Sequence, residues 1–280
     1  MKPVRPYPAM LLQKKSKRIL VVTDLHVGWE AALTEKGIHV PSQTPKILTR
    51  LLRLIKASRP TTLVFLGDVK HAIARVKMEE WHDVPDLFEN LREKVPDIKV
   101  VLGNHDGNLE PLLPADVETL PTKGIAIGDV GLFHGHAWPA PELLQCQTLI
   151  TGHVHPVVTF HDPLGFRIAR QVWVKTRCDR ARLASSLLKY MGIKADADPI
   201  ALLEKRFDMK VKAKHFFIMP SFNDFLGGQS VNRKNIGKNK RSREFIGPIL
   251  RSRSVDIDRA ELFLLDGTFI GTVEQLRSHS

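Results

Sequence analysis

The stretch Ile98-Lys99-Val100-Val101-Leu102-Gly103-Asn104-His105-Asp106 joins an apolar run to a glycine and three side chains that can bind a metal ion or carry a proton. Alone, Asn-His-Asp is also an ordinary polar turn. Four other apolar runs in the chain end in the same kinds of residue. They lead into Asp24-Leu25-His26, Gly67-Asp68, His134-Gly135-His136 and Gly152-His153-Val154-His155. The pattern predicts five strands that each deliver Asp, Asn or His at their ends.

The composition is that of a large globular protein. A chain of 280 residues can bury about three quarters of its unfolded surface in one core. Cys146 and Cys178 lie far apart and form no CxxC pattern, which favours reduced thiols in a cytoplasmic protein. Met1 to Leu12 is broken by three prolines, and no apolar run reaches the length of a membrane helix. We therefore expect a cytoplasmic location and no membrane partner.

The net charge of +12 is concentrated late in the chain. Residues 1–169 hold 20 Lys and Arg against 18 Asp and Glu, whereas residues 170–280 hold 22 against 12. Arg233 to Arg243 carries six cations and no acid. Such a run is often solvated surface, but a concentrated excess also favours binding to a phosphate backbone, with an affinity that falls with salt.

Helical and strand patterns divide the chain into two halves. Helices are expected from Thr44 to Pro60 and from Trp81 to Glu93, the second with Trp81 on its apolar face, and they alternate with strands as in βαβ units. From residue 125 the expected strands follow one another through short turns. The class is therefore α/β, with one mixed sheet or two packed sheets. We expect an unpacked N-terminal arm at 1–17, one domain at 18–280 with a helical insertion at 177–214, a basic loop segment at 220–253, and a closing hairpin at Asp266-Gly267.

The polar strand ends are expected to converge, because ligand sites in open α/β sheets lie beyond the carboxyl ends of the strands. They supply two carboxylates, one amide and four imidazoles: Asp24, His26, Asp68, Asn104, His134, His153 and His155. This donor set suits a pair of divalent ions that polarise a phosphoryl group and hold a deprotonated bridging water for attack. A single histidine or aspartate after a strand is more often a surface or turn residue. The hypothesis of a metal site therefore rests on the seven residues together.

The ordered set Asp-x-His, Gly-Asp, Gly-Asn-His-Asp, His-Gly-His and Gly-His-x-His resembles the calcineurin-like metallophosphoesterases. Other segments, including Val27 to Glu30 and Met219 to Asn223, resemble the archaeal-type branch of predicted phosphoesterases. That branch is related to ligase-associated phosphoesterases and more distantly to double-strand-break nuclease subunits. The resemblance implies a four-layer α/β-β-α sandwich of two mixed sheets flanked by helices, here with a basic C-terminal extension. It also implies two divalent ions, usually Mn²⁺, although iron and zinc occur in such sites.

The resemblance assigns a role to each residue of the set. It implies a first ion held by Asp24, His26 and His155, a second held by Asn104, His134 and His153, and Asp68 as the bridge. It implies that His105 protonates the leaving oxygen, and we expect Asp106 to orient it. His134 is preferred to His136 because it ends the strand directly.

The substrate side is less defined by the sequence. Many family members carry an acid three positions after the bridging aspartate, whereas this chain has His71. Candidate substrate contacts are His71, His136, Asn223, Arg233 and Lys234.

Three functional hypotheses remain open at this point. The leading one is a phosphodiesterase that acts on DNA or RNA as a nuclease. The second is a small-molecule phosphatase or cyclic-nucleotide phosphodiesterase with an incidental basic surface. The third is a protein that binds a nucleoprotein complex with little turnover. The superfamily resemblance is also compatible with a homodimer, although no self-complementary apolar face stands out.

Overall fold

The computed structural model describes residues 1–162, 164–195, 198–233 and 246–278. The chain forms two compact units, which are described one at a time. The first comprises Met1–Thr122 with Ser221–Leu226, and the second comprises Lys123–Pro220 with Gly227–Ser280. The chain therefore returns to the first unit for residues 221–226 after building much of the second. No helix among the described residues is long and apolar enough to cross a membrane.

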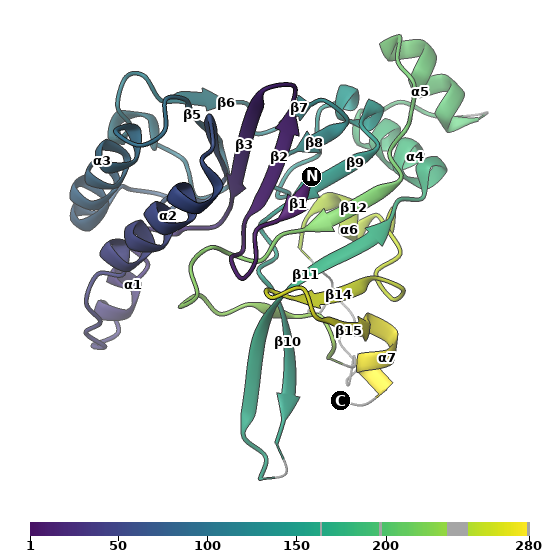
Figure 1. The fold of residues 1–280 in the computed structure, drawn as a ribbon. Coiled ribbons are helices and arrows are strands. Elements are labelled where there is room, and N and C mark those ends of the chain that lie inside the picture. Colours follow the sequence, from purple (N-terminus) through teal and green to yellow (C-terminus); the bar gives the residue numbers. More distant parts are fainter. Residues whose placement is uncertain (163, 196–197, 234–245, 279–280) are drawn as a thin grey trace. The chain divides into compact units, whose positions relative to one another are not determined.

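The first unit is built on a six-stranded mixed sheet in the order β1-β2-β3-β4-β5-β6 (Figure 1). Its strands are β1 (Lys2–Pro3), β2 (Met10–Lys14), β3 (Lys17–Val22), β4 (Thr62–Leu66), β5 (Ile98–Val101) and β6 (Glu118–Leu120). Neighbours from β3 to β6 are parallel, with Val22 paired to Phe65 and Leu66 to Val101. The ends of β3, β4 and β5 therefore lie at one edge of the sheet.

The N-terminal arm corrects the expectation that residues 1–17 stay unpacked. β2 pairs antiparallel with β3 through its whole length, from Met10 with Val21 to Lys14 with Lys17. Ala9 to Leu12 are buried. The three prolines all precede this apolar run, so β2 itself contains no proline.

Two amphipathic helices cover one face of this sheet. They are α2 (Thr44–Ser58) and α3 (Met78–Arg92), and shorter helices are α1 (Ala31–Thr34) and the 3₁₀ turn η1 (Glu110–Leu112). Leu51 and Leu54 of α2 and Phe88 of α3 pack with Phe65 in one core. Trp81, expected on the apolar face of α3, is instead half exposed, and the preceding Glu80 is buried.

The second unit holds a nine-stranded mixed sheet with the main order β13-β10-β11-β12-β9-β8-β7, and β14 pairs with β11 and β15. Its strands are β7 (Ile125–Ile127), β8 (Val130–Leu132), β9 (Thr148–Thr151), β10 (Pro156–His161), β11 (Arg167–Arg177), β12 (His215–Ile218), β13 (Gln229–Ser230), β14 (Glu261–Leu264) and β15 (Phe269–Thr272). β8 and β9 are parallel neighbours, so their ends lie together. Two mixed sheets flanked by helices confirm the predicted fold class.

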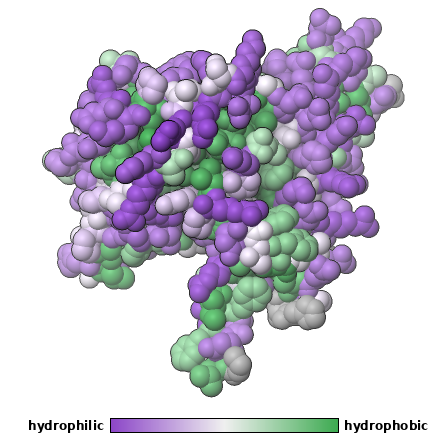
Figure 2. All heavy atoms as spheres, viewed as in Figure 1, coloured by the Kyte–Doolittle hydropathy of each residue, from purple (hydrophilic) through white to green (hydrophobic). Residues whose placement is uncertain are grey.

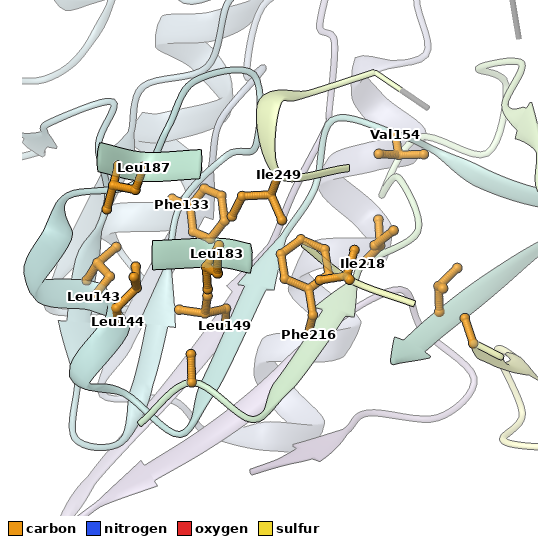
Figure 3. Close-up of a cluster of buried hydrophobic side chains, with 14 of the residues drawn as sticks. Phe133, Leu143, Leu144, Leu149, Val154, Leu183, Leu187, Phe216, Ile218 and Ile249 are labelled. Atoms are coloured by element: carbon orange, nitrogen blue, oxygen red, sulfur yellow. The ribbon is translucent and has the colours of Figure 1, made fainter. Parts of the chain in front are cut away.

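Helices and turns cover the core of the second unit. They are η2 (Pro141–Gln145), α4 (Arg180–Tyr190), α5 (Pro199–Phe207), α6 (Pro248–Arg251) and α7 (Val273–Ser278). Leu183 and Leu187 of α4 pack with Leu149 and Phe216 of the sheet (Figure 3). The segment 177–214, predicted as helical, contains α4 and α5.

A long hairpin of β10 and β11 extends away from the rest of this sheet (Figure 1). Phe160 pairs with Ile168 near its end, and the last residues before the turn, His161 and Arg167, also pair. Apolar side chains are exposed on this hairpin (Figure 2), with Leu164 82% and Phe166 67% exposed. Such a cluster on an exposed hairpin is typical of an interaction surface.

Candidate metal centre

Three loops of the first unit follow its parallel strands and run side by side. The backbone N–H of His26 donates to the carbonyl of Asp68 at 2.9 Å, and that of Val27 to the carbonyl of Val69 at 2.8 Å. The hydroxyl of Thr23 lies 2.9 Å from both Asp24 Oδ2 and the carbonyl of Leu66. Strand pairing therefore continues into the loops and fixes the residues predicted to bind metal.

Five of the seven predicted ligands have left-handed backbone conformations. The φ angles are 57° at Asp24, 46° at His26, 53° at Asp68, 67° at His153 and 47° at His155. A left-handed residue other than glycine or asparagine costs free energy and persists where surrounding contacts enforce it, most often at functional sites. Asp and His adopt this conformation more often than most residues, so the clustering of five such residues, and not any one of them, marks these positions.

Asp106 ties the loop of Asp68 to the turn at Gly103. Its Oδ2 accepts hydrogen bonds from the backbone N–H groups of Asp68 and Gly103, both at 2.8 Å, and its Oδ1 accepts one from Val69 at 2.8 Å. Asp68 in turn accepts at Oδ1 from the N–H of His105 at 2.9 Å. A Cβ at Gly103 would overlap both the carboxylate and the backbone nitrogen of Asp68. Only glycine permits this approach.

The arrangement differs from the expected pairing of Asp106 with His105. The His105 ring uses Nδ1 to hydrogen-bond the backbone carbonyl of His71. Four backbone N–H groups of two loops, those of Asp68, Val69, Lys70 and Gly103, converge on the buried carboxylate of Asp106 instead. Asp106 therefore positions Asp68, and the carbonyl of His71 orients His105.

The surroundings of the Asn104 amide oxygen indicate whether these residues suit a metal ion. Asn104 Oδ1 is buried and accepts no hydrogen bond from any residue that the structure describes. A buried acceptor without a partner costs about 1–3 kcal/mol, which a cation bound to it would remove. Oxygen and imidazole donors also suit Mn²⁺, Fe²⁺ or Zn²⁺. The residues present therefore fit a divalent ion.

Three histidine rings gather in the same unit. One nitrogen from each of His26, His71 and His105 lies within 4.8 Å of the others. His26 Nδ1 is 3.2 Å from His71 Nδ1, and His26 Nε2 is 3.5 Å from Asp68 Oδ2. Burial lowers the pKa of His71, and the positive charge of His105 adds to this effect. His26 is a predicted metal ligand, His105 the predicted general acid and His71 a predicted substrate contact. The structure places these three rings together.

Two buried charged residues support this region, and sequence reasoning missed both. Glu80 Oε1 accepts the N–H groups of His71 at 2.9 Å and Ala72 at 2.6 Å. Lys70 Nζ donates to the carbonyl of His105 at 2.7 Å and to that of Ala72. Burial lowers the pKa of Lys70, while the nearby charges of Glu80, Asp106 and Asp68 oppose this shift. No local sequence signal distinguishes either residue from a surface charge.

The second unit places its histidines at the ends of β8 and β9. His134 is fully buried, and its carbonyl accepts from the N–H of Gly152 at 2.9 Å. Its ring centroid lies 5.0 Å from that of His153 and 5.3 Å from that of His136. A Cβ at Gly135, where φ is 119°, would overlap the hydroxyl of Thr151. Tight packing of the two turns thus brings His134 and His153 together.

The structure places Asn223 and Arg233, two other predicted substrate contacts, in different surroundings. Asn223 is buried, donating through Nδ2 to the carbonyl of Leu25 at 2.9 Å and accepting at Oδ1 from Phe225 at 2.9 Å. It therefore braces the loop of His26, and its contact with substrate stays a prediction. Arg233 is exposed, and Lys234 lies outside the described residues.

The family model for calcineurin-like phosphoesterases matches residues 17–183, which include every predicted ligand. The chain belongs to the calcineurin-like phosphoesterase family. Members are metal-dependent, and the fold and donor residues agree with that class. The protein is thus a metal-dependent phosphoesterase, and its Asp and His groups could bind divalent ions.

Solved structures give two further likenesses. The nuclease MPE of Pseudomonas putida is 16% identical, with 92% of this chain and 97% of that chain covered and a TM-score of 0.49. The phosphoesterase Yfce of E. coli is 23% identical, with 51% of this chain and 73% of that chain covered and a TM-score of 0.33. No curated protein sequence matches the chain.

Proposed function

We propose that this phosphoesterase hydrolyses phosphodiester bonds of nucleic acid with two divalent ions, most readily Mn²⁺. Asp24, His26 and His155 would hold the first ion, Asn104, His134 and His153 would hold the second, and Asp68 would be shared by both. The observation that carries the proposal is the buried, unsatisfied amide oxygen of Asn104 beside strand-end loops with left-handed Asp and His residues. When bound, two ions supply Lewis-acid stabilisation and a nucleophile at neutral pH.

The side chains around this donor set have separate tasks. Asp68 is held by the N–H of His105 and by the close approach of Gly103. His105 hydrogen-bonds the carbonyl of His71 through Nδ1, so Nε2 of the protonated ring is the nitrogen that can give a proton to the leaving oxygen. His105 is therefore the proposed general acid, and Asp106 is a positioning residue for Asp68.

The charge of the chain supports a nucleic-acid substrate. Residues 205–253 hold 13 Lys and Arg against 3 Asp and Glu. A concentrated cationic excess attracts a polyanion and makes its binding depend on salt.

The β10–β11 hairpin supports the same substrate class. Its exposed Phe160 and Phe166 can stack on bases, and the neighbouring Arg167 and Arg170 are exposed. Neither arginine forms an ion pair with a residue that the structure describes. The single acid of this turn, Asp162, is occupied in accepting from the N–H groups of Leu164 and Phe166, both at 2.9 Å.

A substrate screen in Mn²⁺ tests the proposal. The panel contains DNA, RNA, a chromogenic diester, a monoester and cyclic nucleotides, assayed with wild type, Asp68→Ala and His105→Ala. We expect cleavage of DNA or RNA that EDTA abolishes and that both variants lose. Turnover of monoesters or cyclic nucleotides alone would reject the nucleic-acid substrate, and full activity of Asp68→Ala would reject the mechanism.

A further inference from the structure

The orientation of the His26 ring follows from the partners of its two nitrogens. Nε2 lies 3.5 Å from Asp68 Oδ2, on the side of the proposed bridging carboxylate. Nδ1 lies 3.2 Å from His71 Nδ1, which is hydrogen-bond distance. A neutral imidazole carries one proton, and the nitrogen that binds a metal ion must be without it. If Nε2 binds the ion, the proton of His26 resides on Nδ1 and faces His71.

His71 is fixed in a position to receive that proton. Its backbone N–H donates to Glu80 Oε1 at 2.9 Å and to the carbonyl of Val27 at 3.0 Å. Its carbonyl accepts from the His105 ring, and the two rings stack with centroids 5.4 Å apart. Contacts on the backbone and on one ring face thus hold His71 while its Nδ1 is directed at His26.

We propose that His71 is a positioning residue whose Nδ1 accepts the Nδ1 proton of His26 and so directs the Nε2 lone pair of His26 toward a metal ion beside Asp68. This inference rests on the proposed function, because it needs His26 to be a ligand. It replaces the expected substrate contact at His71 with a role in metal binding. Partners of this kind fix the tautomer of a histidine that binds metal. Their loss typically lowers metal affinity by about 10- to 100-fold, and we expect a loss of that size here.

A third ion among His26, His71 and His105 is the competing interpretation. All three rings offer a nitrogen within 4.8 Å of the others. The Nδ1–H of His105 is donated to the carbonyl of His71, so only Nε2 of that ring could serve such an ion. The two interpretations differ in the number of ions bound and in the proton on His26.

Titration of the metal-free full chain with Mn²⁺ tests the role of His71. The variants are His71→Leu, which removes the acceptor, and His71→Asp, which restores one. His82→Leu is the control, because His82 is a largely exposed histidine of α3. We expect His71→Leu to weaken one binding step by about 10- to 100-fold and to leave the other step within twofold. His71→Asp should restore the weakened step, and His82→Leu should match wild type.

The tautomer itself is measured by ¹⁵N NMR of the wild-type chain, without and with Zn²⁺. We expect a proton on Nδ1 of His26 in both states, and a proton on Nε2 would overturn the inference. Two Mn²⁺ steps unchanged in His71→Leu would overturn it and leave the proposed function standing. Three ions in wild type would favour the competing site, and no bound ion in wild type would reject the proposed function as well.

Discussion

Asp106 Oδ2 lies 2.8 Å from the backbone nitrogen of Asp68 and accepts its hydrogen bond. The same carboxylate also accepts from Gly103 and Val69 and is almost fully buried. One side chain thus joins the loop after β4 to the turn after β5. The geometry of the bridging position depends on a residue that is itself no ligand.

Replacement of Asp106 by asparagine is expected to destabilise the first unit. The amide nitrogen would face at least one backbone N–H group that now donates to a carboxylate, so we expect a loss of about 2–3 kcal/mol in the free energy of unfolding. Urea denaturation followed by circular dichroism measures it. Asp116→Asn is the control, since Asp116 forms an exposed ion pair with Arg92 at 3.1 Å and should change stability by less than about 1 kcal/mol. Equal effects of the two variants would contradict the bracing role.

Gly103→Ala is expected to impair activity more than stability. The new Cβ would overlap Asp68, which must shift from its place beside the metal ligands. We expect a loss of phosphodiesterase activity of about 100-fold, as for a displacement of about 1 Å in a reacting group. Gly107→Ala, where the nearest atom to a Cβ is the carbonyl of Ile73 at 3.6 Å, should retain activity. A Gly103→Ala enzyme with wild-type kcat would show that the close approach is not required.

The arginines of the β10–β11 hairpin should contribute to the salt dependence of nucleic-acid binding. If Arg167 and Arg170 each contact one phosphate, the double variant to glutamine lowers the magnitude of the slope of log K against log salt by about 2. Fluorescence anisotropy with a labelled oligonucleotide at graded salt measures this slope. Arg259→Gln is the comparison, because Arg259 lies 3.8 Å from Asp256 and has a counter-charge already. An unchanged slope in the hairpin variant would exclude the hairpin from the binding surface.

Both thiols should react slowly in the folded chain. Burial raises the pKa of Cys178 to about 12, and burial together with the charge of Asp129 raises the pKa of Cys146. The thiolate is the reactive form, so at pH 8 Cys178 should react about a thousandfold more slowly than free cysteine. Titration with a chromogenic disulfide, before and after addition of urea, measures this. Rapid modification of the remaining thiol in folded Cys146→Ser would contradict the raised pKa of Cys178.

The ends of the strands could be predicted because their signals are local. Apolar runs such as Thr62 to Leu66 and Ile98 to Val101 mark buried strands, and a polar residue after each run marks the site edge. The alternation with helices then predicts parallel pairing, which the structure confirms for β3, β4 and β5. The family resemblance supplied the roles of individual residues.

Other features depend on contacts between distant segments and left no local signal. Met10 to Lys14 form a strand because β3 offers a partner, although prolines precede them. Trp81 is exposed and Glu80 buried because the backbone of His71 and Ala72 needs an acceptor. Asn223 braces the carbonyl of Leu25 from 198 residues away in sequence. A pattern of residue types contains no information about such pairings.

The metal stoichiometry of the chain tests the central claim most directly. Metal-free wild type and Asp68→Asn are dialysed against Mn²⁺ and analysed for bound metal, with asparagine chosen because its amide oxygen can still accept from the N–H of His105. The proposed centre predicts two ions per wild-type chain and loss of at least one in Asp68→Asn, with both proteins folded. One ion or none in wild type, or two ions retained by the variant, would contradict a dimetal centre bridged by Asp68.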